Sequence, residues 1–215
     1  MAAFHQYDTG PRVFSCSLGG SLRFPSENSG AHPRRKDRWW SGCKHRRPSV
    51  AGTVYQVASL VIHPQYNSRT SDYDIAVLSV ITPIVFGSGV QSIPLAPAGS
   101  GPVAGATSIF TGWGLTVEGG SASNVLQEVS LPIISQADCR AAYSVSSITD
   151  RMFCAGLLEE GGKDACHGDS GGPVVVGRLL TGLISWGNGC ARPNTPAVNT
   201  NIPSMRQWIL DTTGI

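Results

Sequence analysis

Short apolar stretches rich in β-branched residues recur from residue 51 onward, and they are separated by Gly, Pro, Ser and Asn. Stretches of this length that end at turn-forming residues are typical of β-strands and are too short for most helices. We therefore predict strands over residues 54–62, 75–80, 107–111, 125–134, 174–176 and 179–185. The pattern as a whole predicts an all-β protein.

Two segments depart from the strand pattern. Residues 135–143 predict a short surface helix. Near the C-terminus, Met205, Trp208 and Ile209 stand at positions i, i+3 and i+4, which places them on one face of a helix. We therefore expect the chain to end in a helix that docks through this face.

Composition narrows the class of protein further. The 215 residues are enough for one large β-domain or two small fused barrels, and only 14% of them are charged. A net charge of +2 gives no reason to expect nucleic acid as a partner. No run of 18 apolar residues predicts a membrane span. We expect no metal, no cofactor and a monomer.

The decamer Asp-Ala-Cys-His-Gly-Asp-Ser-Gly-Gly-Pro at residues 164–173 carries the most chemistry. A serine hydroxyl becomes a useful nucleophile when a base removes its proton and fixed donors receive the developing oxyanion. Ser170 lies among glycines, whose backbones can turn tightly and aim their N–H groups into one concavity. The decamer therefore predicts a nucleophilic serine.

The decamer resembles the active-site segment of trypsin-like serine endopeptidases of the chymotrypsin family. Further resemblance to that family runs from about residue 50 to the C-terminus and over residues 14–22. The matching segments are Val-Ile-His-Pro-Gln-Tyr (61–66), Asp-Tyr-Asp-Ile-Ala-Val-Leu (72–78), Thr-Gly-Trp-Gly (111–114), Phe-Cys-Ala-Gly (153–156), Ile-Ser-Trp-Gly-Asn-Gly-Cys (184–190) and the final stretch 205–210.

The resemblance implies a specific architecture of two six-stranded antiparallel β-barrels, with the active site in the cleft between them. The first barrel is expected over about 11–94 and the second over about 95–202, with a C-terminal helix over about 203–212. We expect the first barrel to be incomplete, because it is disturbed at residues 23–49.

Residues 23–49 do not resemble the family. They contain eight Lys or Arg and two Asp or Glu, a net charge of +6, while the remaining chain carries −4. The segment shows neither a two-residue nor a 3.6-residue apolar period. A basic interaction loop is one interpretation. We favour the other, a coding artefact such as a shifted reading frame or a mispredicted exon, because sequence that resembles the family stands on both sides.

The resemblance assigns catalytic roles to three positions. Ser170 matches the nucleophile, and Asp74 matches the carboxylate that orients the catalytic histidine. The backbone N–H groups of Gly168 and Ser170 match the oxyanion hole. Asp72, the nearby alternative to Asp74, is interpreted as part of a surface turn.

The histidine base has no counterpart, because the family's Thr-Ala-Ala-His-Cys segment is not found in the chain. The candidates by position are His45 and His32, although neither has an apolar strand before it or a cysteine directly after it. His63 matches a surface strand end, and His167 is expected at the rim of the pocket. Loss of this base in a serine-protease triad costs on the order of a millionfold in kcat. We therefore expect no measurable endopeptidase activity from the chain as printed.

The substrate pocket is implied by the same resemblance. Asp164 matches the acidic residue at its base, which selects a substrate Arg or Lys because a buried carboxylate without a partner is costly. The pocket wall is implied to include Ser185, Trp186, Gly187 and Ala197. Ala197 stands where the family has a glycine, and Asn199 stands where it has an aromatic residue.

Six cysteines favour an oxidising compartment and hence secretion, although the N-terminal residues lack the basic start and apolar core of a signal peptide. The resemblance implies the disulfides Cys139–Cys154 and Cys166–Cys190. It leaves two further cysteines, Cys16 and Cys43, either as a third bridge or as free thiols. Asp169 matches the residue that pairs with a new N-terminal amine after activation, but no Ile-Val-Gly-Gly start is found.

Three functional readings follow from the sequence. The first is a secreted serine endopeptidase that hydrolyses peptide bonds after Arg or Lys through an acyl-enzyme on Ser170. Its partners would be protein or peptide substrates and protease inhibitors. The second is a catalytically dead homologue that binds other molecules through the remaining pocket. The third is a damaged gene product. The intact Ser170, Asp74 and Asp164 favour the first as the function of the gene.

Overall fold

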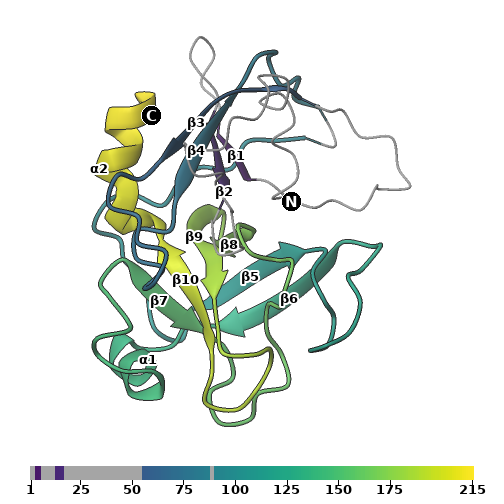
Figure 1. Ribbon diagram of the computed structural model, residues 1–215, viewed down its shortest axis with the longest axis vertical. Coiled ribbons are helices and arrows are strands. Elements are labelled where there is room, and N and C mark those ends of the chain that lie inside the picture. Colours follow the sequence, from purple (N-terminus) through teal and green to yellow (C-terminus); the bar gives the residue numbers. More distant parts are fainter. Residues whose placement is uncertain (1–2, 6–12, 17–54, 88–89) are drawn as a thin grey trace, which may run out of the picture.

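The computed structural model describes residues 3–5, 13–16, 55–87 and 90–215. It is mostly β, as the apolar pattern predicts, and its strands form one four-stranded and one six-stranded sheet. In Figure 1 the four-stranded sheet lies above the six-stranded one, and a C-terminal helix runs beside the upper sheet. The atypical segment 23–49 lies outside the described residues.

The four-stranded sheet is antiparallel, with the strand order β1-β2-β4-β3. Its strands are β1 (Ala3–His5), β2 (Val13–Cys16), β3 (Val57–Ile62) and β4 (Ala76–Val80). The predicted strands at 54–62 and 75–80 are confirmed as β3 and β4. The other strands expected of a first barrel would come from segments that include residues outside the described ones.

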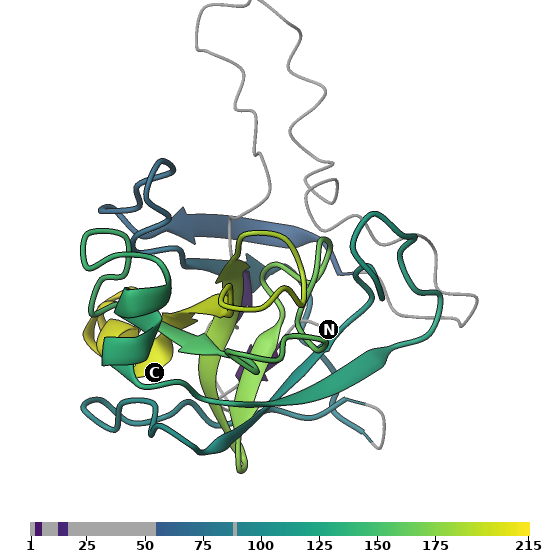
Figure 2. The same ribbon diagram turned by 90° about the horizontal axis from the view of Figure 1, so that it is seen from below.

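The six-stranded sheet is also antiparallel, in the order β6-β5-β8-β9-β10-β7. Its strands are β5 (Thr107–Gly112), β6 (Gln127–Pro132), β7 (Met152–Ala155), β8 (Pro173–Val176), β9 (Leu179–Trp186) and β10 (Ala197–Asn201). The sheet curls, as the view from below in Figure 2 shows, and a bridge between Ile133 and Ala155 links its two edges. β7 and β10 are additions to the strands that we predicted.

Two buried clusters hold these layers together. One fills the curl of the six-stranded sheet and consists of Phe110, Leu131, Ile133, Phe153, Ala155, Val174, Ile184 and Ala197. The other joins both sheets to the C-terminal helix and consists of Ile75, Leu180, Leu183, Ile202, Met205 and Ile209. The second cluster packs Ile75, the residue before β4, against Leu180 and Leu183 of β9. This contact joins the four-stranded sheet to the six-stranded sheet next to the candidate site.

Both predicted helices are confirmed. α1 (Gln136–Ala142) begins after Ser135, whose hydroxyl accepts the Asp138 N–H at 3.0 Å, a common N-cap arrangement. α2 (Ile202–Thr213) buries Met205 and Ile209, as their spacing predicts. In the part of the chain that the structure describes, no helix has the length and apolar character needed to cross a membrane.

Among the described residues there are two disulfides, and they are the pairs that the resemblance implies. Cys139–Cys154 fastens α1 to β7, with a Cα–Cα distance of 5.6 Å. Cys166–Cys190 joins the loop that carries Ser170 to the loop after β9, with a Cα–Cα distance of 5.3 Å. The side chains of Cys16 and Cys43 lie outside the described part.

Candidate active site

Asp74 is a completely buried carboxylate held by hydrogen bonds from the opposite sheet. It stands two residues before β4 and has 0% exposure. Its Oδ2 accepts the Ser185 hydroxyl at 2.7 Å, and its backbone carbonyl accepts the Thr200 hydroxyl at 2.9 Å. A buried carboxylate needs such donors to offset its lost hydration. The structure therefore places Asp74 at the ends of β9 and β10.

The loop that carries Ser170 reaches the same end of β9. The Gly171 N–H donates to the Ile184 carbonyl at 2.8 Å, and the Ile184 N–H donates to the Gly172 carbonyl at 3.0 Å. Ile184 directly precedes Ser185, which binds Asp74. Ser170 itself is exposed. The serine loop and Asp74 are thus bonded to two consecutive residues of β9.

The conformation of the serine loop depends on a glycine and a carboxylate. Gly168 has a φ of +100°, and a Cβ at this position would lie 3.1 Å from the Gly114 Cα. Asp169 accepts the N–H groups of Gly114 at 2.7 Å and Cys166 at 3.0 Å. Within the described residues, the N–H groups of Gly168 and Ser170 donate to no other group. These two donors therefore remain available for an oxyanion.

Asp164 is a partly buried carboxylate without a cationic partner among the described residues. It accepts the N–H groups of Ala165 at 2.8 Å and Ala191 at 3.0 Å. Burial raises the pKa of its carboxyl to about 6; these hydrogen bonds oppose the rise, and the charge of Asp169 adds to it. Arg192, which follows Ala191 in the chain, pairs instead with Glu118, its Nε lying 2.8 Å from Oε2.

The wall expected from the sequence continues from β9. The Ser185 side chain is committed to Asp74, while the Trp186 ring lies edge-on to Tyr143 with centroids 4.9 Å apart. A Cβ added to Gly187 would meet nothing closer than the Gly189 carbonyl oxygen at 3.8 Å. A methyl group at Gly187 would therefore make ordinary van der Waals contact with its surroundings and no clash.

Tyr143 is a site residue that the sequence analysis missed. Its hydroxyl donates to the Pro196 carbonyl at 2.7 Å, and burial raises its pKa to about 12. It connects the end of α1 to Trp186 and to the segment before Ala197. No motif surrounds it, because this role comes from packing against distant residues.

Ala197 and Asn199 are both deeply buried. Ala197 is 5% exposed and belongs to the cluster against which Ala165 packs. The Asn199 amide donates to the Ala197 carbonyl at 3.1 Å, while its Oδ1 has no partner within the described part of the chain. The Asn199 side chain, which is shorter than the aromatic residue expected from the family, is thus bonded within its own sheet.

His63 is buried, and the expected surface position is wrong. It is 6% exposed and stacks on Tyr73 with ring centroids 4.5 Å apart, while Trp208 lies 4.8 Å away. Helix α2 supplies Trp208, a contact that local sequence does not reveal. His167 is exposed on the serine loop. His32 and His45, the positional candidates for the base, lie outside the described residues.

Asp72 also differs from its expected place in a surface turn. Its side chain is only 14% exposed and pairs with Arg151, with Nη2 lying 2.6 Å from Oδ2. Burial alone would raise the pKa of Asp72, but hydrogen bonds from Arg151 and Thr149 outweigh it and hold the pKa below its ordinary value. The surface prediction failed because both partners come from the distant loop that precedes β7.

Comparison with known proteins shows the family of the chain. The trypsin family model matches residues 28–209. The chain is 46% identical over 159 residues to a vitellin-degrading protease of Bombyx mori, covering 74% of this chain and 60% of that protein. It is 44% identical over 163 residues to trypsin eta of Drosophila melanogaster, covering 76% and 62%. A trypsin of Phaedon cochleariae is 40% identical over 167 residues, covering 78% and 65%.

The family match defines the protein as a member of a class of serine proteases, and within that class the chain belongs to the trypsin family. It spans less than two thirds of the length of these curated relatives.

Proposed function

We propose that the gene of this protein encodes a secreted serine endopeptidase that hydrolyses peptide bonds after Arg or Lys. For the chain as printed, in which the family's histidine segment is missing, turnover requires that His32 or His45 supplies the base. The observation that carries the specificity is Asp164, a partly buried carboxylate bound only by backbone N–H groups among the described residues. Such a group gains most from a ligand that brings its own positive charge. Gly187 has no side chain that would narrow the proposed pocket, which suits a long substrate side chain that reaches toward Asp164.

In the proposed reaction the Ser170 hydroxyl attacks the carbonyl carbon of the peptide bond. The N–H groups of Gly168 and Ser170 receive the negative charge that develops on the carbonyl oxygen. The serine proton passes through a histidine to the leaving amine, and water then hydrolyses the acyl-enzyme. Asp74 would hold that histidine in the required orientation, because it is itself held by Ser185.

The histidine is proposed to come from residues 23–49, where His32 and His45 are the candidates. Neither histidine whose side chain the structure describes offers an alternative with similar support. His63 is enclosed by Tyr73 and Trp208, and His167 stands on the same loop as Ser170. The architecture that goes with this proposal is two barrels, over about 11–94 and 95–202, followed by the C-terminal helix.

A second candidate function is a binding protein that retains the pocket but has lost catalysis. The missing family segment around the histidine favours it, because that segment supplies the base. Its ligands would be the same Arg- or Lys-bearing proteins, including protease inhibitors. It would bind a cation at Asp164 and show no turnover.

The test separates binding from catalysis. The full chain is refolded oxidatively and assayed with peptide amides that carry Arg, Lys or Leu at the cleavage position, beside Ser170→Ala. Benzamidine, a small amidinium, reports on the pocket by calorimetry, with Asp164→Asn as control. Turnover that requires Ser170 and favours Arg or Lys supports the endopeptidase. Benzamidine binding without turnover supports the second candidate, and no benzamidine binding contradicts both.

A further inference from the structure

The turn before Asp74 is joined by an ion pair to the loop that precedes β7. Asp72 accepts two hydrogen bonds from the Arg151 guanidinium, at 3.1 Å from Nε and 2.6 Å from Nη2. Its Oδ1 also accepts the Thr149 hydroxyl at 2.8 Å. A bidentate guanidinium–carboxylate pair fixes the relative orientation of the two side chains as well as their distance. These three hydrogen bonds therefore hold Asp72 against the 149–151 loop, and Arg151 lies 79 residues away from Asp72 in the chain.

The residue between the two aspartates is held in an unusual conformation. Tyr73 has a φ of +54°, which bulky residues adopt only when surrounding contacts enforce it. Its ring is enclosed on two sides, by His63 at 4.5 Å between ring centroids and by the Arg151 guanidinium at 4.8 Å from the ring centroid. Arg151 thus contacts both Asp72 and Tyr73.

Both anchors of the turn stand on one rigid part of the molecule. The Arg151 carbonyl accepts the N–H of Asn201, the last residue of β10, at 2.8 Å. Thr200, the neighbouring residue of β10, donates to the Asp74 carbonyl. The distance between the Asp72 and Asp74 anchors is therefore set by β10 and the loop bonded to it.

We propose that Asp72 is a positioning residue for the reaction: its pair with Arg151 and Thr149 holds the 72–75 turn, and thereby the Asp74 carboxylate, against Ser185. The kinetic part of this proposal rests on the proposed function of Asp74. Without the bonds from Asp72 to Arg151 and Thr149, Tyr73 relaxes from its left-handed conformation. The backbone that precedes Asp74 is then no longer held in one position.

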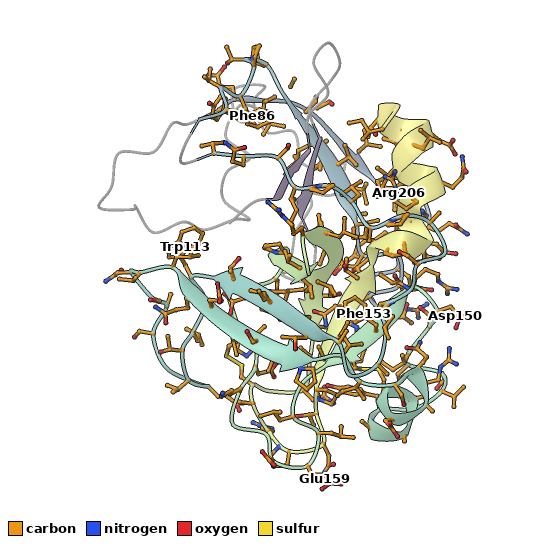
Figure 3. The ribbon with its side chains drawn as sticks, turned by 180° about the vertical axis from the view of Figure 1, so that it is seen from behind. Phe86, Trp113, Asp150, Phe153, Glu159 and Arg206 are labelled. Carbon is orange, nitrogen blue, oxygen red and sulfur yellow. A yellow bond between two sulfur atoms is a disulfide. The ribbon has the colours of Figure 1, made fainter. Side chains whose placement is uncertain are left out.

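The test compares Asp72→Asn with a matched control. Asp150→Asn makes the same chemical change one residue from Arg151, where Asp150 pairs with Arg140 at 2.7 Å and is 81% exposed. Figure 3 shows Asp150 at the outer edge of the molecule. Amide hydrogen exchange over residues 72–78 should quicken by at least about tenfold in Asp72→Asn and stay unchanged in Asp150→Asn. Benzamidine affinity should be unchanged in both, because neither aspartate bonds to Asp164 or to the residues whose N–H groups Asp164 accepts.

A kinetic readout separates positioning from general stability. If the unmodified chain shows Ser170-dependent turnover, Asp72→Asn should lower its kcat by on the order of ten- to a hundredfold and leave KM unchanged. Arg151→Lys keeps the charge without the two-pronged geometry and should give an intermediate effect; it also serves if Asp72→Asn does not fold.

Two results would overturn the proposal. One is unchanged exchange over residues 72–78 in both Asp72→Asn and Arg151→Lys. The other is a loss of benzamidine affinity that parallels the exchange, since it would show general loosening of the molecule. Absence of turnover in the unmodified chain contradicts the proposed function instead, and the exchange result still decides the role of Asp72.

Discussion

Ser185 and Asp74 are joined by a hydrogen bond of 2.7 Å across 111 residues of sequence, and both side chains are buried. Ser185 ends the buried part of β9, and Asp74 stands before β4, so the bond links the two sheets at the candidate site. A hydroxyl that donates to a buried carboxylate contributes more than one that donates to a neutral oxygen.

The first prediction concerns this bond. Ser185→Ala should lower the free energy of unfolding by about 2 kcal/mol, because the buried carboxylate loses a donor. Ser108→Ala is the matched control: Ser108 is also fully buried, but its hydroxyl donates to the neutral Leu131 carbonyl at 2.7 Å. Denaturant unfolding of both variants checks the difference. A larger loss in Ser108→Ala would contradict the special role of the Asp74 bond.

The second prediction concerns the pH dependence of the pocket. The pKa of Asp164 is raised to about 6, so the free carboxyl is largely protonated below that pH and must release its proton to bind a cation. Benzamidine affinity should be constant above about pH 7 and fall by about tenfold for each pH unit below 6. Calorimetry between pH 4 and 8, at about one-unit steps, measures it. Asp164→Asn should bind weakly, with no such pH dependence.

Asp164 also opposes folding as the pH rises. Its folded-state pKa lies above the unfolded value, so the folded chain holds the extra proton between them. Stability from this group is therefore greatest below the unfolded pKa and declines as the pH rises toward about 6. Asp164→Asn should remove this decline in denaturant unfolding, and an unaltered pH profile would contradict the burial of the carboxyl.

The third prediction compares the two disulfides. Replacing either pair by Ala should cost about 2–4 kcal/mol of stability, since each bridge closes a loop of similar length. Only loss of Cys166–Cys190 should weaken benzamidine binding, because Cys166 bonds to Asp169 and the Cys190 loop supplies the Ala191 N–H to Asp164. Equal loss of affinity in both variants would indicate general loosening.

The fourth prediction concerns His63. Burial lowers its pKa, and the charge of nearby Asp72 opposes this shift. The folded state therefore binds its proton less readily than the unfolded chain, and stability should fall as the pH drops below the ordinary histidine pKa of about 6.5. Denaturant unfolding should show this fall, and His63→Phe should reduce it while keeping the stacking on Tyr73. An identical fall in that variant would assign it to other groups.

Local sequence patterns correctly predicted a mostly β protein with a C-terminal helix, and they pointed to a nucleophilic serine. Apolar runs near 107–111 and 174–176 became β5 and β8, and the spacing of Met205 and Ile209 correctly predicted the face of α2. The decamer around Ser170 identified the nucleophile as a candidate. These features depend on local backbone preference and side-chain periodicity, which neighbouring residues carry.

Which side chains are buried, and which groups they bind, depends on the tertiary structure. β7 escaped prediction because its four residues are all buried and show no alternation, and β10 because it includes the polar Asn199 and Thr200. The local sequence around Asp72 predicts a surface turn, but Asp72 is partly buried because it pairs with Arg151, 79 residues away. Burial and pairing depend on contacts between distant segments, and no local pattern encodes a partner that only folding brings near.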